Sequence, residues 1–171
     1  MENLGGLCLL LAFSIGCYAI LASLVGAWKQ KPFLLVSSER AVFAAWGLIV
    51  VASGILVNAL MTGDFRLAYV ASHSNKTMEW YYKFASWWGG QEGSLLFWSF
   101  LLASYSAIVV FRTRRKPEFR SMMPYITAVL MSTLVFFLIL ITFVENPFKV
   151  ASVGRNPTSA LVMNAMIVVI T

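Results

Sequence analysis

Residues 3–28 read NLGGLCLLLAFSIGCYAILASLVGAW, a run of 26 residues without one charged side chain. A membrane-spanning helix needs about 20 predominantly apolar residues. Three further uncharged stretches, 41–63, 93–111 and 121–144, are each too long and too continuous to be core strands. These four segments predict an all-α integral membrane protein with four transmembrane helices.

The composition agrees with this fold class. The 171 residues are 60% hydrophobic and 12% charged, with a mean hydropathy of +0.79. A soluble domain is about 45–50% apolar and about 25% charged, so a soluble fold and a disordered chain are both excluded as default interpretations. We expect residues 1–171 to form a single membrane module. Its expected parts are spans at about 4–28, 41–62, 93–111 and 121–144, an external segment at 64–92 and a short external tail at 145–171.

The two ends of the chain need separate interpretation. The first apolar run is over-long for a signal peptide and lacks a basic region before it, which predicts a retained span. The last uncharged stretch, Asn156 to Thr171, has only 16 residues. That length is short for a span, so we expect an interfacial or incomplete segment.

The basic residues are concentrated in two places, and this sets the expected orientation. Residues 29–40 hold Lys29, Lys31 and Arg40, and residues 112–120 hold five basic side chains. Short loops rich in Lys and Arg stay in the cytoplasm, which places both termini and residues 64–92 outside. The net charge of +6 is therefore interpreted as an orientation signal, and no nucleic-acid partner is expected. Contact of the second cluster with anionic lipid or a partner is the less favoured alternative.

The segment between the second and third spans has two patterns. Phe65, Leu67, Tyr69 and Ala71 alternate with other residues, which predicts a short strand. Residues 78–88 then hold six aromatic side chains, of which positions 80, 84, 87 and 88 share one face of a helix. We expect this helix to lie in the membrane interface. A plain aromatic belt is the alternative, although no other loop end in the chain has this density.

Polar and glycine residues follow the aromatic helix. In the run Gly89-Gly90-Gln91-Glu92-Gly93 the glycines allow close approach of a backbone or a ligand. Glu92 begins the third span, where a carboxylate is stabilised by the helix dipole by about 0.3–1 kcal/mol. A proton-transfer or partner-anchoring role for Glu92 stays open beside that structural one. Asn58, a polar residue in the second span, is expected to bond a neighbouring helix.

Three motifs together resemble a known family. They are YVASHSN at 69–75, WYYK at 80–83 and WGGQEGSLLFW at 88–98. This pattern is similar to the N-terminal part of the CcmF/NrfE family, the large haem lyase subunits of cytochrome c maturation. Residues 145–148, ENPF, also resemble the family's exit from its fourth helix. The resemblance covers residues 1 to about 150.

The sequence also departs from that family. Its members are several times longer, and their tryptophan-rich haem-handling domain and haem-holding histidines lie C-terminal to the region matched here. We therefore expect a fragment, a split-gene subunit or a partial chain, in which haem is held mainly by parts of the family absent from these residues. No catalytic residues are assigned, and the chain alone is not expected to be catalytic.

The resemblance implies covalent attachment of haem to an apocytochrome c outside the bacterial cytoplasmic membrane. The implied partners are a haem chaperone, the apocytochrome, thiol-handling maturation subunits, the remainder of the lyase and the lipid membrane. The candidate platform for haem or a partner consists of Trp87, Trp88, Gly89, Gly90, Gln91, Glu92, Gly93 and Trp98.

His73, the only histidine, is a weaker candidate. It is interpreted first as a hydrogen-bonded loop residue, and as a haem-iron ligand only together with another segment or chain. Two other functions stay open for the chain as a whole. One is a fragment of a transporter or quinone-interacting subunit whose aromatic segment acts as a gate, and the other is a purely structural membrane subunit.

Overall fold

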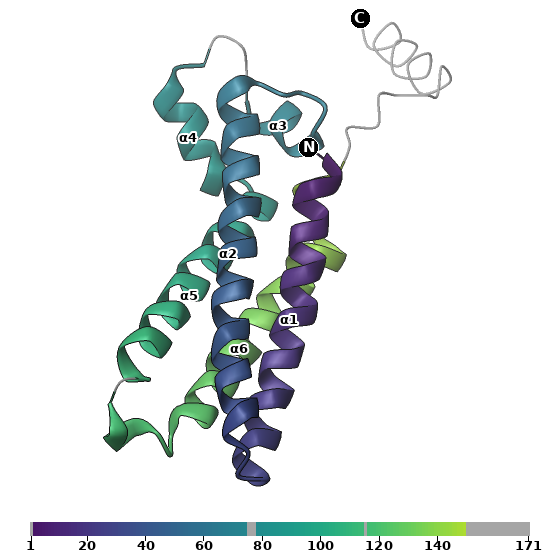
Figure 1. The fold of residues 1–171 in the computed structure, drawn as a ribbon. Coiled ribbons are helices and arrows are strands. Elements are labelled where there is room, and N and C mark those ends of the chain that lie inside the picture. The colour runs from purple at the N-terminus through teal and green to yellow at the C-terminus, as the bar shows by residue number, and fades with distance from the viewer. Residues whose placement is uncertain (1, 75–77, 115, 150–171) are drawn as a thin grey trace, which may run out of the picture.

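The computed structural model describes residues 2–74, 78–114 and 116–149, and all regular structure within them is helical (Figure 1). The four long helices match the four expected spans in position and in apolar character, which confirms the all-α membrane fold. The long helices are α1 (Glu2–Trp28), α2 (Pro32–Thr62), α5 (Gln91–Thr113) and α6 (Met123–Ile139), the last continued by a π-helical turn, η2 (Leu140–Val144). The short ones are α3 (Ala68–His73), α4 (Trp80–Gly89) and a 3-10 turn, η1 (Pro117–Phe119).

Small residues let the first helices approach closely. α1 packs along α2 and α6, and its contact face includes the fully buried Ala12 and Ala19. A Cβ atom at Gly16 would lie 2.7 Å from Val135 Cγ2 of α6, and one at Gly26 would lie 2.8 Å from Leu35 Cδ2 of α2. Close backbone approach of this kind is typical of helix packing in membranes. α5 contacts α2, α6 and α4, and it leans away from α2 toward the lower end of Figure 1.

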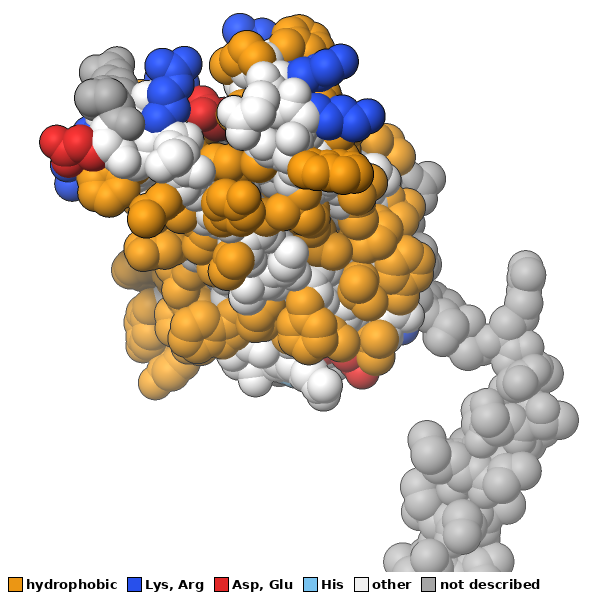
Figure 2. Space-filling view, turned by 90° about the horizontal axis from the view of Figure 1, so that it is seen from below, with side chains coloured by type: hydrophobic (Ala, Val, Ile, Leu, Met, Phe, Trp, Pro, Cys, Tyr) orange, Lys and Arg blue, Asp and Glu red, His pale blue; other side chains and the backbone are white. Residues whose placement is uncertain are grey.

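The turn at the basic end of the molecule is much shorter than the loop expected at 29–40. That prediction is wrong for residues 32–40, which are helical. Only Lys29 to Lys31 form the turn, with Gln30 at φ 51° and Lys31 as the N-cap of α2. Pro32 takes the first helical position, for which its fixed φ is suited. Arg40 therefore lies inside a helix. Figure 2, seen from below, shows the Lys and Arg side chains gathered on two protrusions beside a broad hydrophobic surface.

The strand expected around Phe65 to Ala71 is also wrong, because residues 68–73 form α3. Tyr69 and Val70 are adjacent in sequence and both are buried, at 2% and 0% exposure. Consecutive side chains of a strand point to opposite faces, so a strand at the surface of the bundle would expose one of them. One turn of helix buries both.

The chain leaving η2 returns to the end of the bundle that carries α3 and α4. Phe148 is 5% exposed, and its ring covers Gly5 at the start of α1. The Ala68 N–H at the start of α3 donates to the Lys149 carbonyl at 2.9 Å. The segment 145–149 therefore ties α1 to α3. The predicted interfacial stretch from Asn156 to Thr171 lies outside the described residues.

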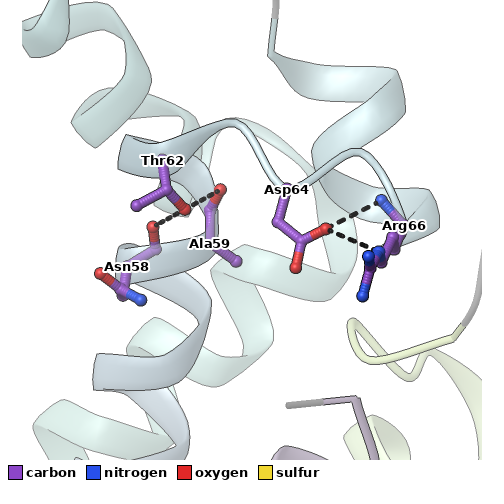
Figure 3. A network of polar contacts seen from close by, with 5 residues as sticks. All are labelled: Asn58, Ala59, Thr62, Asp64 and Arg66. Carbon is purple, nitrogen blue, oxygen red and sulfur yellow. Dashed lines mark hydrogen bonds and ion pairs between the residues drawn. The ribbon is translucent and has the colours of Figure 1, made fainter.

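The polar residues at the end of α2 bond locally (Figure 3). Thr62 Oγ1 donates to the Asn58 carbonyl at 2.8 Å, and the Arg66 N–H donates to Asp64 Oδ1 at 3.3 Å. The Asn58 amide points away from these groups and is exposed. Within the described part of the chain its side chain makes no hydrogen bond to a neighbouring helix, contrary to the expectation from the sequence.

Candidate functional site

The aromatic helix predicted at 78–88 is present as α4, and it meets α5 in a sharp turn. α4 ends at Gly89 and α5 begins at Gln91, so Gly90 alone separates the two helices. Gly90 has an extended backbone, with φ −115° and ψ 166°. We refer to residues 87–93 as the aromatic corner. It contains seven of the eight platform residues expected from the sequence.

The buried phenol of Tyr69 holds the aromatic corner through hydrogen bonds. Its hydroxyl donates to the Ser86 carbonyl at 2.6 Å and accepts the Gly90 N–H at 3.2 Å. Burial raises the pKa of Tyr69 above its ordinary value, the Gly90 N–H bond opposes this, and the charge of Glu92 adds to the increase. The phenol therefore stays protonated at neutral pH and keeps its role as donor.

His73 belongs to the same support. Its ring stacks on Tyr69 with centroids 4.5 Å apart and planes 22° apart. The His73 Nδ1 atom lies 2.8 Å from Ser72 Oγ and 3.2 Å from the Tyr69 carbonyl. The His73 carbonyl accepts a hydrogen bond from Ser86 Oγ at 2.9 Å. The His73 ring also lies close to Gly90 of the corner, because a Cβ atom at Gly90 would lie 2.5 Å from His73 Nε2. These contacts hold His73 by hydrogen bonds and stacking, but His73 is the last residue of α3 and does not lie in a loop as expected.

Among the described residues, no group of three or more His, Cys, Asp or Glu side chains is arranged to hold a metal ion. Cys8 and Cys17, which their spacing on one helix keeps apart, are both free.

The two tryptophans of the corner have different environments. Trp87 is 8% exposed, and its ring lies 5.1 Å from Phe97 and 5.7 Å from Phe100 of α5. Its Nε1 has no hydrogen-bond partner among the described residues. Trp88 is 47% exposed and makes an edge contact with Phe84 and a tilted contact with Phe97. Trp87 therefore fixes α4 to α5, and Trp88 presents its ring outward.

The glycines of the corner also differ. Around Gly89 the described residues leave open space where a Cβ would be placed. A Cβ at Gly93 would instead collide with the Tyr69 hydroxyl and the Trp87 carbonyl. Gly90 and Gly93 are thus required by packing, whereas Gly89 leaves the surface beside Trp88 unobstructed.

The remaining platform residues are Gln91, Glu92 and Trp98. Gln91 is exposed, and Glu92 is half-buried in the first turn of α5. That position is the one the helix dipole favours for a carboxylate, and it leaves the other proposed roles of Glu92 open. Trp98 is 57% exposed and lines a groove with Tyr105 and Phe137 between α5 and α6. Its ring contact to the corner passes through Phe97, whose centroid lies 6.1 Å away.

Sequence reasoning did not assign Tyr69 and Ser86 to the site. Their roles depend on contacts across 17 residues of chain, which no local pattern encodes. Phe97 and Phe100 lie within an apolar span and were likewise not assigned. The available signals were that Tyr69 begins one of the three family motifs and that Phe97 lies within another, at 88–98.

Comparisons with known proteins give a consistent result. The chain is 34% identical over 149 residues to the cytochrome c-type biogenesis protein CcmF of Pseudomonas aeruginosa, covering 87% of this chain and 22% of that protein. It is 31% identical over 128 residues to the probable cytochrome c-type biogenesis protein NrfE of Escherichia coli, covering 75% and 23%. No family model matches the chain.

The fold comparison points the same way. A solved structure of the cytochrome c haem lyase CcmF matches with a TM-score of 0.78 and 30% identity, over 86% of this chain and 24% of that one. The chain thus spans about a fifth to a quarter of the length of the relatives it matches. By sequence and by fold, the chain belongs to the CcmF/NrfE family of cytochrome c-type biogenesis proteins, of which it represents one membrane-spanning portion.

Proposed function

We propose that the chain is the N-terminal part of a membrane haem lyase and takes part in the covalent attachment of haem to apocytochrome c. The support is the family membership together with the match to the CcmF haem lyase structure. The partners would be a haem chaperone, the apocytochrome, thiol-handling maturation subunits and the remainder of the lyase. The bond-forming step is assigned to those other parts, because the family's haem-handling domain and haem-holding histidines lie C-terminal to the region matched here.

Within this function, the aromatic corner is the contact surface for haem or for the partner that delivers it. The observation that carries this proposal is the half-exposed ring of Trp88 beside the open backbone of Gly89. A flat aromatic side chain next to a glycine admits a planar ligand or an aromatic partner side chain at close range. Trp87 and Tyr69 would hold the corner in place without touching the ligand.

The iron ligands of haem would lie outside this chain. His73 is stacked on Tyr69 and faces Gly90, so its ring is occupied by packing. Haem titration of the purified 171-residue chain, followed by absorption spectroscopy, tests this assignment. We expect no stoichiometric histidine-ligated spectrum from the chain alone, and one only after the C-terminal complement of a relative is added. A stoichiometric haem spectrum of the chain alone, lost in His73→Ala, would contradict it.

A matched pair of variants tests the role of the corner. Trp88 and Tyr81 are both on α4 and are exposed to nearly the same degree, at 47% and 48%. Loss of an exposed aromatic anchor typically costs about 2 kcal/mol of binding free energy, more than tenfold in affinity. With the complement present, Trp88→Ala should lower the yield of holocytochrome c about tenfold, and Tyr81→Ala should leave it near the wild-type level. Equal yields from both variants would reject the corner as the contact surface.

The orientation follows from the same proposal. The bacterial cytoplasmic membrane would hold the protein with the two basic turns inside and with both termini and residues 64–92 on the periplasmic side. Single cysteines at Arg66 and Lys116, in a background where Cys8 and Cys17 are replaced by Ala, test this. A membrane-impermeant maleimide applied to intact cells should label the first position and not the second. The reverse labelling would reverse the topology.

A further inference from the structure

A groove between α2 and α5 lies outside the candidate site, toward the basic end of the molecule. Its volume is about 430 Å³, within the range of about 300–1,000 Å³ that small-molecule sites occupy. The walls are mostly aromatic and aliphatic. The lining residues include Phe43, Trp46, Ser104, Ile108, Phe111 and Arg112. Both walls come from candidate membrane-spanning helices, and Arg112 is the one charged residue among the described residues that line the groove. We therefore expect the groove to face the hydrocarbon layer, with its Arg112 end at the level of the headgroups.

The two ends of the groove differ in chemistry. At the end farther from the basic residues, Trp46 Nε1 donates to Ser104 Oγ at 3.1 Å and links the two helices. At the end nearer the basic residues, Arg112 lines the groove in the last turn of α5. The Arg114 guanidinium lies 5.6 Å from the ring centre of Phe43 and 5.1 Å from that of Phe111. Ser104 and Arg112 are eight residues apart on one helix, which corresponds to about 12 Å along its axis.

An apolar groove that ends in two guanidinium groups is complementary to a molecule with an acyl chain and an anionic headgroup. Basic pockets between transmembrane helices bind anionic lipid headgroups, and guanidinium groups match phosphate oxygens in geometry. Glu39 lies close enough to Arg114 and Arg120 to interact with them electrostatically. It offsets part of the charge of Arg114 and Arg120, so Arg112 contributes more than Arg114 to the attraction for a phosphate.

We propose that the α2–α5 groove binds one anionic glycerophospholipid of the surrounding leaflet. One acyl chain lies along Phe43, Ile108 and Trp46, and the phosphate is held between Arg112 and Arg114. This site does not depend on the proposed haem lyase function, because it lies at the opposite end of α5 from the aromatic corner.

Quenching of Trp46 fluorescence tests the proposal. If the headgroup is at Arg112, Ser104 and its partner Trp46 lie about 12 Å along α5 from the phosphate. That depth is within one leaflet of the hydrocarbon core, about 15 Å thick, so phospholipids brominated at the middle of the acyl chain place the quencher near Trp46. The full 171-residue chain in mixed micelles is titrated with brominated phosphatidylglycerol or phosphatidylcholine. The Trp46 component is the difference between wild type and Trp46→Phe. Near-membrane arginines each contribute about 1 kcal/mol, roughly fivefold in affinity, so two contribute about 25-fold. Phosphatidylglycerol should therefore quench this component at about 25-fold lower mole fraction.

Two double variants separate the specific site from general charge. Arg112→Gln with Arg114→Gln should abolish the preference for phosphatidylglycerol. Lys29→Gln with Lys31→Gln removes the same charge from exposed positions of the α1–α2 turn and should retain the preference. Circular dichroism checks that all variants stay helical. Equal quenching by both lipids in wild type, a preference that survives the arginine changes, or no quenching of the Trp46 component would each overturn the proposal.

Discussion

The Tyr69 hydroxyl accepts the backbone N–H of Gly90 at 3.2 Å, although 21 residues of chain separate the two. The same hydroxyl donates to Ser86 at 2.6 Å, so one phenol satisfies a carbonyl near the end of α4 and the N–H at the start of α5. Free carbonyl and N–H groups at helix ends are costly when they are buried without partners. This arrangement lets two helices meet at a single glycine.

Replacing Tyr69 by Phe removes both bonds and keeps the ring. A buried polar group left without its partner costs about 1–3 kcal/mol. We therefore expect the free energy of unfolding of Tyr69→Phe to fall by about that amount at pH 8, measured by denaturation in detergent. Tyr81→Phe, at an exposed position of α4, is the control and should be close to neutral. A neutral Tyr69→Phe would show that water replaces both bonds.

We expect the stability difference between wild type and Tyr69→Phe to depend on pH. Burial raises the pKa of the Tyr69 phenol above its usual value of 10.0, despite the opposing Gly90 bond. The folded state therefore holds its proton more strongly than the unfolded state, and the stabilisation is complete below about pH 10. It is lost as the pH rises through the folded-state pKa. The difference in unfolding free energy between wild type and Tyr69→Phe should shrink from pH 9 to pH 11, and a constant difference would contradict the assignment.

Adjacent glycines of the corner provide a second matched test. A Cβ at Gly90 would lie 2.5 Å from His73 Nε2 and 2.8 Å from Tyr69 Cε2, so both stacked rings must move. Gly90→Ala should cost about 1–3 kcal/mol of stability, as is usual for overpacking. Gly89→Ala meets open space at the end of α4 and should be neutral or slightly stabilising. Thermal unfolding of the two variants side by side measures the difference, and similar melting temperatures would contradict it.

The sequence predicted the long helices well because composition and length alone specify a membrane span. It failed where the deciding information was tertiary. Tyr69 and Val70 sit in an alternating pattern typical of a strand, but the burial of both residues favours a helical turn. Arg40 marked the expected end of a loop, but nothing between Pro32 and Arg40 breaks a helix, and α2 begins at the proline.

The platform residues of the candidate site were predicted from the sequence, but which of them are buried and which are exposed was not. The motif around Trp87 and Trp88 drew attention to both residues equally. Which of the two is buried depends on Phe97 and Phe100, which approach from the next helix. Trp98 shares the motif, but the pitch of α5 turns it toward the groove between α5 and α6.

The different burial of Trp87 and Trp88 predicts that their replacement by Ala lowers stability to different degrees. Trp87→Ala removes a ring that is 8% exposed and packed on α5, and such changes cost about 3–5 kcal/mol. Trp88→Ala removes a half-exposed ring and should cost less than half of that. Unfolding in detergent measures both. A Trp88→Ala variant as unstable as Trp87→Ala would mean that any loss of cytochrome maturation in Trp88→Ala reflects unfolding.

The start of α1 and the segment 145–149 meet where the Phe148 ring covers Gly5. A Cβ at Gly5 would collide with the ring of Phe148, whereas one at Gly6 meets open space among the described residues. Both substitutions to Ala gain about 0.5–1 kcal/mol of helix propensity. Only Gly5→Ala must displace Phe148, and with it the neighbouring Lys149 carbonyl that accepts the Ala68 N–H.

Amide hydrogen exchange at Ala68 reports on that displacement directly. The N–H is protected by its bond to Lys149, so its exchange should accelerate in Gly5→Ala and stay at the wild-type rate in Gly6→Ala. Phe148→Ala should accelerate it as well, because the same ring anchors the segment. If Gly5→Ala leaves the Ala68 exchange rate unchanged, the Phe148 ring can leave Gly5 without moving Lys149. The segment 145–149 would then not couple α1 to α3, whose Tyr69 holds the aromatic corner.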